Sequence, residues 1–541
     1  MRHMLAAGLL ATLPAMMPAA ALAQAASPIP RLESHDGRHA LMVDGAPFTM
    51  LAAQVNNSSN YAEPLATAWP LLDRIHANTV EVPIAWQQVE PVEGQFDLSF
   101  LQALLDQARA HDKRVVLLWF GTWKNTGYAY TPDWVKLDAR RFPRMKTSAG
   151  KDHGVLSAHG KATLAADLRA FVKVMEYLRD HDPQHTVIMV QPENETGSYR
   201  NPRDYSATAN ALFAQAIPSA LAKATGKRGT WTQAFGAQAD RAFNTWYVAS
   251  YVDAIAAAGK AAKPLPMYVN AALAGPSNVP DPDGVASGGP QQDVLDIWKA
   301  AAPHIDLAAP DIYDRTSANV IQYLDRYARP DNALLVPEIG NAREFHRFFY
   351  AALGRGAIGY APFGIDGTGY FNFPLGARDL DEAALAPLVQ AYAAVGSIMR
   401  DWARLAAKGP TWGAAKPDDG AAQTTTLGKW TITASWGEWQ FGMKDWTWLK
   451  SEPAPWGKEP VGGVAVAQMG PDEFLVVGDH VRVNFAATDA APGALVLRVE
   501  EGGFRDGRWV TARVWNGDQT DYGINLIDRP QVLKVTMGRY R

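Results

Sequence analysis

One apolar segment, Thr186-Val187-Ile188-Met189-Val190, runs directly into Gln191-Pro192-Glu193-Asn194-Glu195. A continuous run of β-formers without alternation is typical of a parallel strand that is buried on both faces. The arrangement recurs where Ala333-Leu334-Leu335-Val336-Pro337 precedes Glu338. Parallel barrels present their functional groups at the C-terminal ends of the strands, so the two segments predict carboxylates at one barrel mouth.

Short apolar segments alternate with amphipathic ones over residues 30–404. Helical spacing of apolar residues predicts helices over Leu164–Leu178 and Phe100–Ala110. The alternation predicts an α/β fold, a (β/α)8 TIM barrel. A dinucleotide-binding sheet is disfavoured, because Gln54-Val55-Asn56-Asn57-Ser58 is not a Gly-rich loop. The expected strands lie near Phe48–Ala53, Thr79–Pro83, Arg114–Trp119, Thr186–Val190, Met267–Asn270, Leu307–Ile312, Leu334–Pro337 and Ile358–Ala361.

Different sequence patterns flank the predicted barrel. Residues 1–23 have the pattern of a signal peptide, with an apolar stretch from Met4 to Ala20 and an A-x-A site at Ala21-Leu22-Ala23. A membrane anchor is the alternative, which the short, Ala- and Pro-rich stretch disfavours. We therefore expect a periplasmic or secreted protein with no membrane contact after cleavage. Residues 405–426 predict a linker, and residues 427–541 predict a smaller all-β domain that either binds carbohydrate or supports the barrel.

Composition excludes several classes of function. The 51 basic and 55 acidic residues give no footprint for nucleic acid and favour an uncharged substrate. The absence of Cys excludes disulfides, a cysteine nucleophile and thiolate metal sites. The sequence contains neither metal-ligand spacing nor a Gly-x-Ser-x-Gly turn near a strand end, so no metal or cofactor is expected. The oligomeric state stays open.

The two strand-end carboxylates, Glu195 and Glu338, suggest cleavage of a glycosidic bond. Retaining hydrolysis uses one protonated and one ionised carboxyl group, about 5 Å apart. Each residue also has a simpler interpretation. Glu195 fits a solvated loop, and Glu338 fits the start of a helix.

Other residues near the predicted strand ends are candidates for substrate binding. Glu193 shares the strand parity of Glu195, so it is either a ligand for sugar hydroxyls or a structural partner of Arg or Lys. Tyr313 either donates a hydrogen bond to the nucleophile or packs in the core. Asn194 fits a sugar contact or a turn. The remaining candidates, some of them expected in the core, are Glu81, Trp86, Trp123, Asn125, Tyr199 and Asn270.

The segment Gln191-Pro192-Glu193-Asn194-Glu195, followed by Gly197-Ser198-Tyr199, resembles the Q-x-E-N-E region of glycoside hydrolase family 35, which includes β-galactosidases. The stretch from Asn78 through Trp86 to Phe96 is similar to another motif of that family. The resemblance spans about Leu51 to Phe363. It implies that Glu195 is the general acid/base, that Asn194 holds the 2-hydroxyl of the sugar and that Glu338 is the nucleophile.

The chain also departs from that family. Asp182-Pro183-Gln184-His185 replaces the family's Gly-Gly-Pro, and Thr196 replaces an aromatic residue. Gly121-Thr122-Trp123 replaces Ala-Glu-Trp, so an acidic sugar ligand is missing there. These differences resemble a bacterial branch that acts on side-chain galactose of plant polysaccharides such as xyloglucan.

The hypothesis is therefore a retaining exo-glycosidase that hydrolyses terminal β-galactosides of an oligosaccharide or polysaccharide. One alternative is another retaining barrel hydrolase, such as an endo-glycanase or an arabinosidase. A second alternative is a non-catalytic carbohydrate-binding protein.

Overall fold

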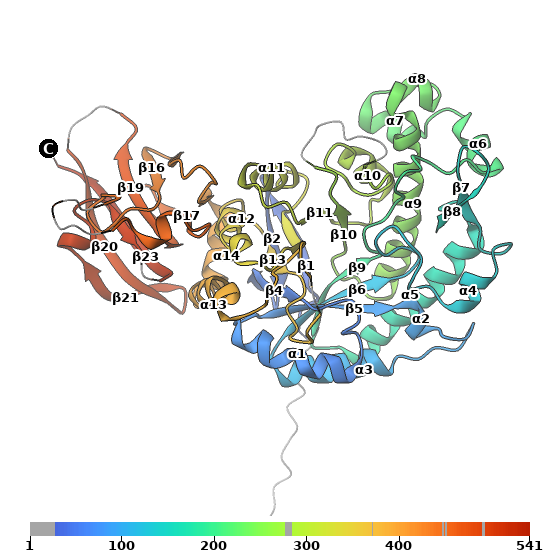
Figure 1. Cartoon of the computed structure of the whole chain (residues 1–541), viewed down its shortest axis with the longest axis horizontal. Coiled ribbons are helices and arrows are strands. Elements are labelled where there is room, and N and C mark those ends of the chain that lie inside the picture. Colours follow the sequence, from blue (N-terminus) through green and yellow to red (C-terminus); the bar gives the residue numbers. More distant parts are fainter. Residues whose placement is uncertain are drawn as a thin grey trace, which may run out of the picture.

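The computed structural model describes residues 27–275, 284–370, 372–445, 448, 452–489, 493–527 and 529–540. The predicted signal peptide lies outside the described residues. A parallel barrel with surrounding helices is followed in the chain by an all-β domain that packs against one side of it (Figure 1). The predicted fold class is confirmed.

Eight parallel strands form the barrel, and each overlaps a predicted strand. Their order is β10-β11-β12-β13-β4-β5-β6-β9, and a bridge between Val190 and Met267 joins β9 to β10. Every residue of β4, β5, β9, β11, β12 and β13 is buried, which explains their continuous apolar runs. The strands are β4 (Met50–Gln54), β5 (Thr79–Ala85), β6 (Arg114–Phe120), β9 (Val187–Pro192), β10 (Tyr268–Ala272), β11 (Leu307–Ile312), β12 (Leu335–Ile339) and β13 (Gly359–Pro362).

Helices cover the outside of the barrel, and α3 and α5 confirm the two helices predicted from apolar spacing. The longer helices are α1 (Ala62–Arg74), α3 (Ser99–Ala110), α5 (Lys161–His181), α9 (Ala239–Ala262), α11 (Ser317–Tyr327), α13 (Glu382–Gly396) and α14 (Met399–Lys408). The shorter ones are α2 (Trp86–Val89), α4 (Asp133–Leu137), α6 (Ala207–Phe213), α7 (Ser219–Thr225), α8 (Trp231–Phe235), α10 (Leu295–Ala301) and α12 (Phe348–Leu353).

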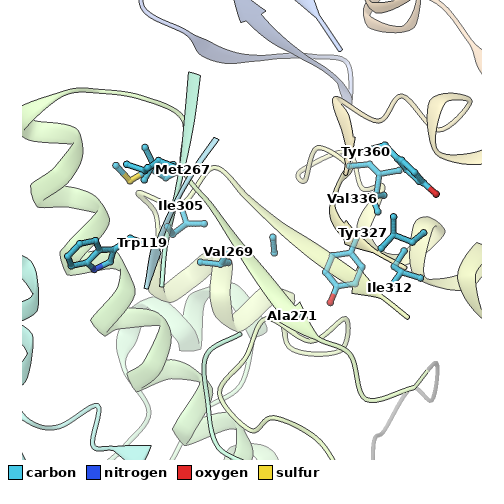
Figure 2. Close-up of a cluster of buried hydrophobic side chains, with 14 of the residues drawn as sticks. Trp119, Met267, Val269, Ala271, Ile305, Ile312, Tyr327, Val336 and Tyr360 are labelled. Atoms are coloured by element: carbon cyan, nitrogen blue, oxygen red, sulfur yellow. The ribbon is translucent and has the colours of Figure 1, made fainter. Parts of the chain in front are cut away.

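Alternate residues of β6 enter two different cores. In β6, Val115, Leu117 and Trp119 belong to the layer between strands and helices. Their neighbours Val116, Leu118 and Phe120 belong to the cluster inside the barrel. Figure 2 shows part of the outer layer, with residues of β6, β10, β11, β12 and β13. This period of two leaves strand-end side chains of one parity directed into the barrel mouth.

A small antiparallel sheet that the sequence analysis did not predict precedes the barrel. It consists of β1 (Arg31–His35), β2 (Arg38–Val43) and β3 (Ala46–Phe48). Its residues Leu41, Val43 and Phe48 are buried in the same cluster as the barrel interior. The sheet therefore closes the end of the barrel opposite the mouth. A second unpredicted hairpin, β7 (Arg144–Lys146) and β8 (Asp152–Leu156), lies between β6 and α5 in the chain.

The C-terminal domain consists of two antiparallel sheets around their own core. The order in one sheet is β14-β17-β18-β23-β20-β21, and in the other β15-β16-β19-β22. The strands are β14 (Thr411–Ala415), β15 (Gln423–Leu427), β16 (Trp430–Ser435), β17 (Gly463–Gly470), β18 (Glu473–Asp479), β19 (Val481–Ala487), β20 (Ala494–Arg505), β21 (Arg508–Trp515), β22 (Ile524–Leu526) and β23 (Gln531–Arg539).

The predicted linker over residues 405–426 is wrong, because this stretch holds the end of α14, strand β14 and most of β15. Gly413 of β14 lies against Gly354 at the end of α12, where a Cβ on Gly354 would be 1.9 Å from the Gly413 nitrogen. Glycine at this position allows close backbone packing between the domains, so its presence does not indicate flexibility. Arg347 also donates to the Lys416 carbonyl at 2.8 Å. This packing favours a supporting role for the domain.

No single helix among the described residues is long and apolar enough to cross a membrane. The pair α13 and α14 meets that test only jointly, with a bend of 74° between the two helices.

Candidate active site

The structure brings Glu195 and Glu338 together at the barrel mouth. Glu195 follows β9, and Glu338 lies near the end of β12. Asp311, at the end of β11, joins them. One carboxylate oxygen from each of the three residues lies within 4.8 Å of the other two. The separation agrees with the spacing that retaining glycosidases use. Residues distant in sequence thus converge on one point.

Specific hydrogen bonds hold Glu195 in a strained backbone conformation. Its φ is +45° and that of Glu193 is +65°, a left-handed conformation that costs energy in residues with a Cβ. The Glu195 N–H donates to Asn270 Oδ1 at 2.9 Å, and its carbonyl accepts from Thr126 at 3.0 Å. These bonds attach the end of β9 to β10 and to the loop after β6. The side chain is 12 % exposed, so it is accessible from the cavity.

Glu338 is held by its strand and by Tyr313. It pairs in register with Asp311 of the neighbouring strand β11. The Tyr313 hydroxyl donates to Glu338 Oε1, the contact considered in the sequence analysis. Burial and the charge of Glu195 raise the pKa of Glu338 to about 7, although Lys124, Tyr313 and Gln54 oppose the shift. The carboxyl pair therefore retains one proton up to nearly neutral pH.

Lys124 is a site residue that the sequence analysis missed. Its Nζ lies 3.6 Å from Glu195 Oε2, and its side chain is only 4 % exposed. It also lies 5.2 Å from the centre of the Phe120 ring. Its sequence signal was its position directly after Trp123, in the loop that follows β6. The ammonium group places a positive charge beside carboxyl groups that would otherwise repel one another.

Asp311 was also missed as a site residue, although it precedes Tyr313 by two positions at a strand end. Its Oδ2 accepts a 2.7 Å hydrogen bond from Asn270 Nδ2. Burial, Glu338 and Glu195 raise the pKa of the Asp311 carboxyl well above its usual range. Asn270 thus links Asp311 to the backbone of Glu195, and this predicted residue is buried behind the residues that line the cavity.

The carboxylates open into a cavity of about 960 Å³ at the barrel mouth. Its walls include five of the predicted residues, namely Asn125, Glu195, Tyr199, Tyr313 and Glu338. Asp366 fixes one wall: it accepts from the backbone and side chain of Asn56 and from Ser59, and so joins the loops after β4 and β13. Unpredicted wall residues include Asn56, Lys124, Tyr130, Asp311, Asp314, Tyr370, Asn372 and Leu375.

Four predicted residues lie behind the cavity wall. Glu81 is buried beneath Glu338 and accepts from the Tyr268 hydroxyl at 3.3 Å. Trp123 packs edge-on against Tyr251 with ring centres 4.8 Å apart. Asn194 is 1 % exposed, and neither polar atom of its side chain has a hydrogen-bond partner among the described residues. Glu193 is the fourth. None of the four is among the residues that form the cavity wall.

Trp86 lies in the core, so the expectation that it contacts sugar is wrong. It packs edge-on against Trp134, and its Nε1 donates to Glu90 at 3.0 Å. Glu90 also accepts from the Gly94 N–H and from Arg169. The Trp86-to-Phe96 motif therefore stabilises a turn at the edge of the barrel.

Glu193 is neither a sugar ligand nor a partner of Arg or Lys, and both of its predicted roles are wrong. Its Oε2 accepts from the Trp123 N–H at 2.6 Å, and it forms a hydrogen bond with buried Asp167. Asp167 in turn accepts from Trp119 and Thr122. Burial and the neighbouring Asp167 raise the pKa of Glu193 well above its usual range. We therefore expect the two acids to hold one proton between them, in the position that supports the loop carrying Lys124.

The three carboxylates at the mouth are also the described residues best placed to offer oxygen ligands to a cation. The spacing of possible metal ligands in the sequence could not reveal this cluster, because its members lie on or after three separate strands. Lys124 already supplies a positive charge at this point. The residues thus suit acid–base and nucleophilic chemistry on an uncharged substrate.

Comparisons with known proteins point in the same direction. Residues 62–249 match the family model of glycoside hydrolase family 42, described as β-galactosidase. Residues 388–527 match a model described as a domain of unknown function (DUF5597). A β-galactosidase from Xanthomonas manihotis is 29% identical over 186 residues, which cover 32% of this chain and 28% of that protein. The chain thus matches less than a third of that relative's length.

Solved structures with a similar arrangement include a β-galactosidase from Rahnella sp. R3, with 16% identity and a TM-score of 0.47. The match covers 69% of this chain and 59% of that one. The catalytic domain of a β-amylase from Paenibacillus polymyxa matches with 13% identity and a TM-score of 0.45, over 63% of this chain and 96% of that one. Membership of family 35 is not confirmed, because the matching model is that of family 42.

A proton retained by Glu193 predicts that the difference in stability between the wild type and Glu193→Gln depends on pH. Above the unfolded pKa of about 4.5, the unfolded chain loses the Glu193 proton while the folded protein keeps it. Rising pH therefore destabilises the wild type relative to Glu193→Gln, whose amide still donates to Asp167. We expect the difference in unfolding free energy to grow in favour of the variant by up to about 1.4 kcal/mol per pH unit.

Urea titrations of both proteins between pH 4.5 and 7.5 measure this difference. Glu176→Gln, on the same helix as Asp167 but half-buried beside Lys173, is the matched control and should show no such trend. Parallel pH curves for Glu193→Gln and the wild type would contradict a protonated Glu193.

Proposed function

We propose that this protein is a retaining exo-glycosidase that hydrolyses terminal β-galactosides. The convergence of Glu195 and Glu338 within 4.8 Å across a cavity is the observation that supports it most directly. The match of residues 62–249 to the β-galactosidase model supports the choice of sugar. A carbohydrate-binding protein without catalysis would not need two acids at this separation, one of which has a strongly raised pKa.

The proposed reaction is a double displacement. Glu338 attacks the anomeric carbon and forms a glycosyl ester, while Glu195 gives its proton to the leaving oxygen. Glu195 then removes a proton from water, which attacks the ester and releases the sugar with its original configuration. The Tyr313 hydroxyl stabilises the charge on Glu338 before attack, because it donates to the carboxylate.

The site is walled on one side, as the pocket of an exo-acting enzyme requires. The Asp366 hydrogen bonds hold the loops after β4 and β13 together and form a fixed wall on one side of the carboxylates. An endo-glycanase needs a groove open at both ends. The volume of about 960 Å³ is at the upper end of the range for small-ligand pockets, which leaves room beyond a single sugar ring.

We further propose that the galactose is a side-chain residue of a plant polysaccharide such as xyloglucan. Tyr370, Leu375 and Tyr199 belong to the cavity wall and are 68%, 50% and 39% exposed. Aromatic and apolar faces at the rim suit the apolar faces of further sugar rings in the leaving group.

We also propose that the protein is exported to the periplasm or beyond, on the basis of the residue 1–23 pattern. Mass spectrometry of the protein purified from its native cells should then find Gln24 as the first residue. A cytoplasmic protein that retains Met1 would contradict export.

The two glutamates can be assigned by the products of azide rescue. Glu338→Gly should lose at least about 10³-fold in kcat on 4-nitrophenyl β-galactoside, and azide should restore part of it as α-galactosyl azide. Glu195→Ala should retain the first step on substrates with good leaving groups and yield β-galactosyl azide, because azide then attacks the intermediate.

Glu33→Gly, on the exposed strand β1, is the control and should keep full activity. Exchange of the two azide products would reverse the assignment, and unchanged activity in both variants would exclude the mechanism. A panel of other aryl glycosides, including arabinosides, tests the alternative of a different retaining hydrolase.

The rim predicts a selective effect on large substrates. Tyr370→Ala should raise KM for galactosylated xyloglucan oligosaccharides about threefold to tenfold, which corresponds to about 1 kcal/mol of lost stacking, and leave 4-nitrophenyl β-galactoside nearly unchanged. Tyr540→Ala, 70% exposed in the C-terminal domain, is the control. Equal changes for both substrates would argue against a leaving-group platform at Tyr370.

A further inference from the structure

Asp311 is a buried acid at the cavity that the double displacement leaves without a role. It is the last but one residue of β11, is 2% exposed and lines the cavity. One of its oxygens lies within 4.8 Å of oxygens of both Glu195 and Glu338. A sugar held between those two glutamates is therefore within reach of Asp311.

The Asp311 side chain is fixed on one side and free on the other. Oδ2 accepts from Asn270 Nδ2 at 2.7 Å, and Asn270 Oδ1 accepts from the Glu195 N–H at 2.9 Å. Oδ1 is buried and has no hydrogen-bond partner among the described residues. A buried oxygen without a partner is costly, which indicates that a ligand completes the site.

The other two carboxyl groups have partners that stabilise a negative charge. Lys124 lies 3.6 Å from Glu195, and the Tyr313 hydroxyl donates to Glu338. The hydrogen-bond partner of Asp311 is the neutral amide of Asn270, which serves a carbonyl oxygen as well as it serves a carboxylate, and the charge of Lys124 offsets only part of the repulsion from the two glutamates. Its burial beside the two glutamates therefore favours the neutral acid, in agreement with its strongly raised pKa.

We propose that Asp311 binds the sugar as a neutral carboxylic acid, whose Oδ1–H donates a hydrogen bond to a ring hydroxyl of the glycone between Glu195 and Glu338. The proposal rests on the proposed glycosidase function and adds a substrate ligand to it. Gly121-Thr122-Trp123, after β6, lacks the acidic sugar ligand that family 35 has at that position. The proposal gives this chain an acidic sugar ligand on β11 instead.

Two substitutions distinguish a neutral donor from a charged acceptor. In Asp311→Asn, the amide oxygen still accepts from Asn270, and the amide N–H replaces the acid proton. We expect kcat/KM on 4-nitrophenyl β-galactoside within about threefold of the wild type. Asp311→Ala removes the donor and should lose about 10- to 100-fold in kcat/KM and a similar factor in the Kd for galactose.

The pH dependence gives a readout that a purely structural role would not change. In the wild type, the Glu195–Glu338 pair and Asp311 must each keep a proton, so the alkaline limb of log kcat/KM should approach a slope of −2. In Asp311→Asn only the pair titrates, and the slope should be −1.

Thermal unfolding of each variant checks the fold, and Asp325→Asn on the exposed face of α11 is the control. Equal losses in the asparagine and alanine variants would overturn the proposal in favour of an ionised Asp311. Unchanged galactose binding and kcat/KM in a folded alanine variant would exclude the contact. A wild type that binds galactose without hydrolysing any aryl glycoside would refute the proposed catalysis, and the Kd values would still decide the role of Asp311.

Discussion

Three carboxyl groups, two of them buried, lie within 4.8 Å of one another, and this is the constraint on which the site depends. Three negative charges at this separation in a buried site would repel one another strongly, and one lysine offsets only part of that repulsion. The stable arrangement is therefore one in which two protons remain on the cluster. Asp311 holds one of them, and the Glu195–Glu338 pair holds the other, which is the proton that glycoside cleavage uses.

A second, deeper pair of acids supports this cluster. Glu193 and Asp167 share a proton behind the loop after β6, and Glu193 accepts from the Trp123 N–H. Lys124 follows Trp123 directly, so the position of the ammonium group depends on the buried acid pair. The left-handed conformations of Glu193 and Glu195 turn one side chain into the protein and the other into the cavity. The same Glu-Asn-Glu sequence thus serves both the support and the chemistry.

The barrel was predictable from the sequence because its strands are buried on both faces and read as continuous apolar runs. The convergence of Glu195 and Glu338 followed from strand-end positions alone. Glu193 was misjudged because its partner Asp167 comes from α5, and strand parity says nothing about contacts with a distant helix. The linker was misjudged because Gly413 packs tightly against Gly354, a reason for glycine that local sequence cannot distinguish from flexibility. Lys124 and Asp311 were missed because their roles depend on charges that only the fold brings together.

The charges of the cluster fit both halves of the proposed reaction. In the form that glycoside cleavage requires, the proton of the Glu195–Glu338 pair lies on Glu195 and Glu338 is ionised, beside the Lys124 ammonium and a neutral Asp311. After attack, Glu338 is a neutral ester and Glu195 carries the negative charge, now 3.6 Å from the Lys124 ammonium. The net charge of these four groups stays at zero, and the negative charge moves toward the lysine. Lys124 therefore stabilises Glu195 in the ionised form that must next accept a proton from water.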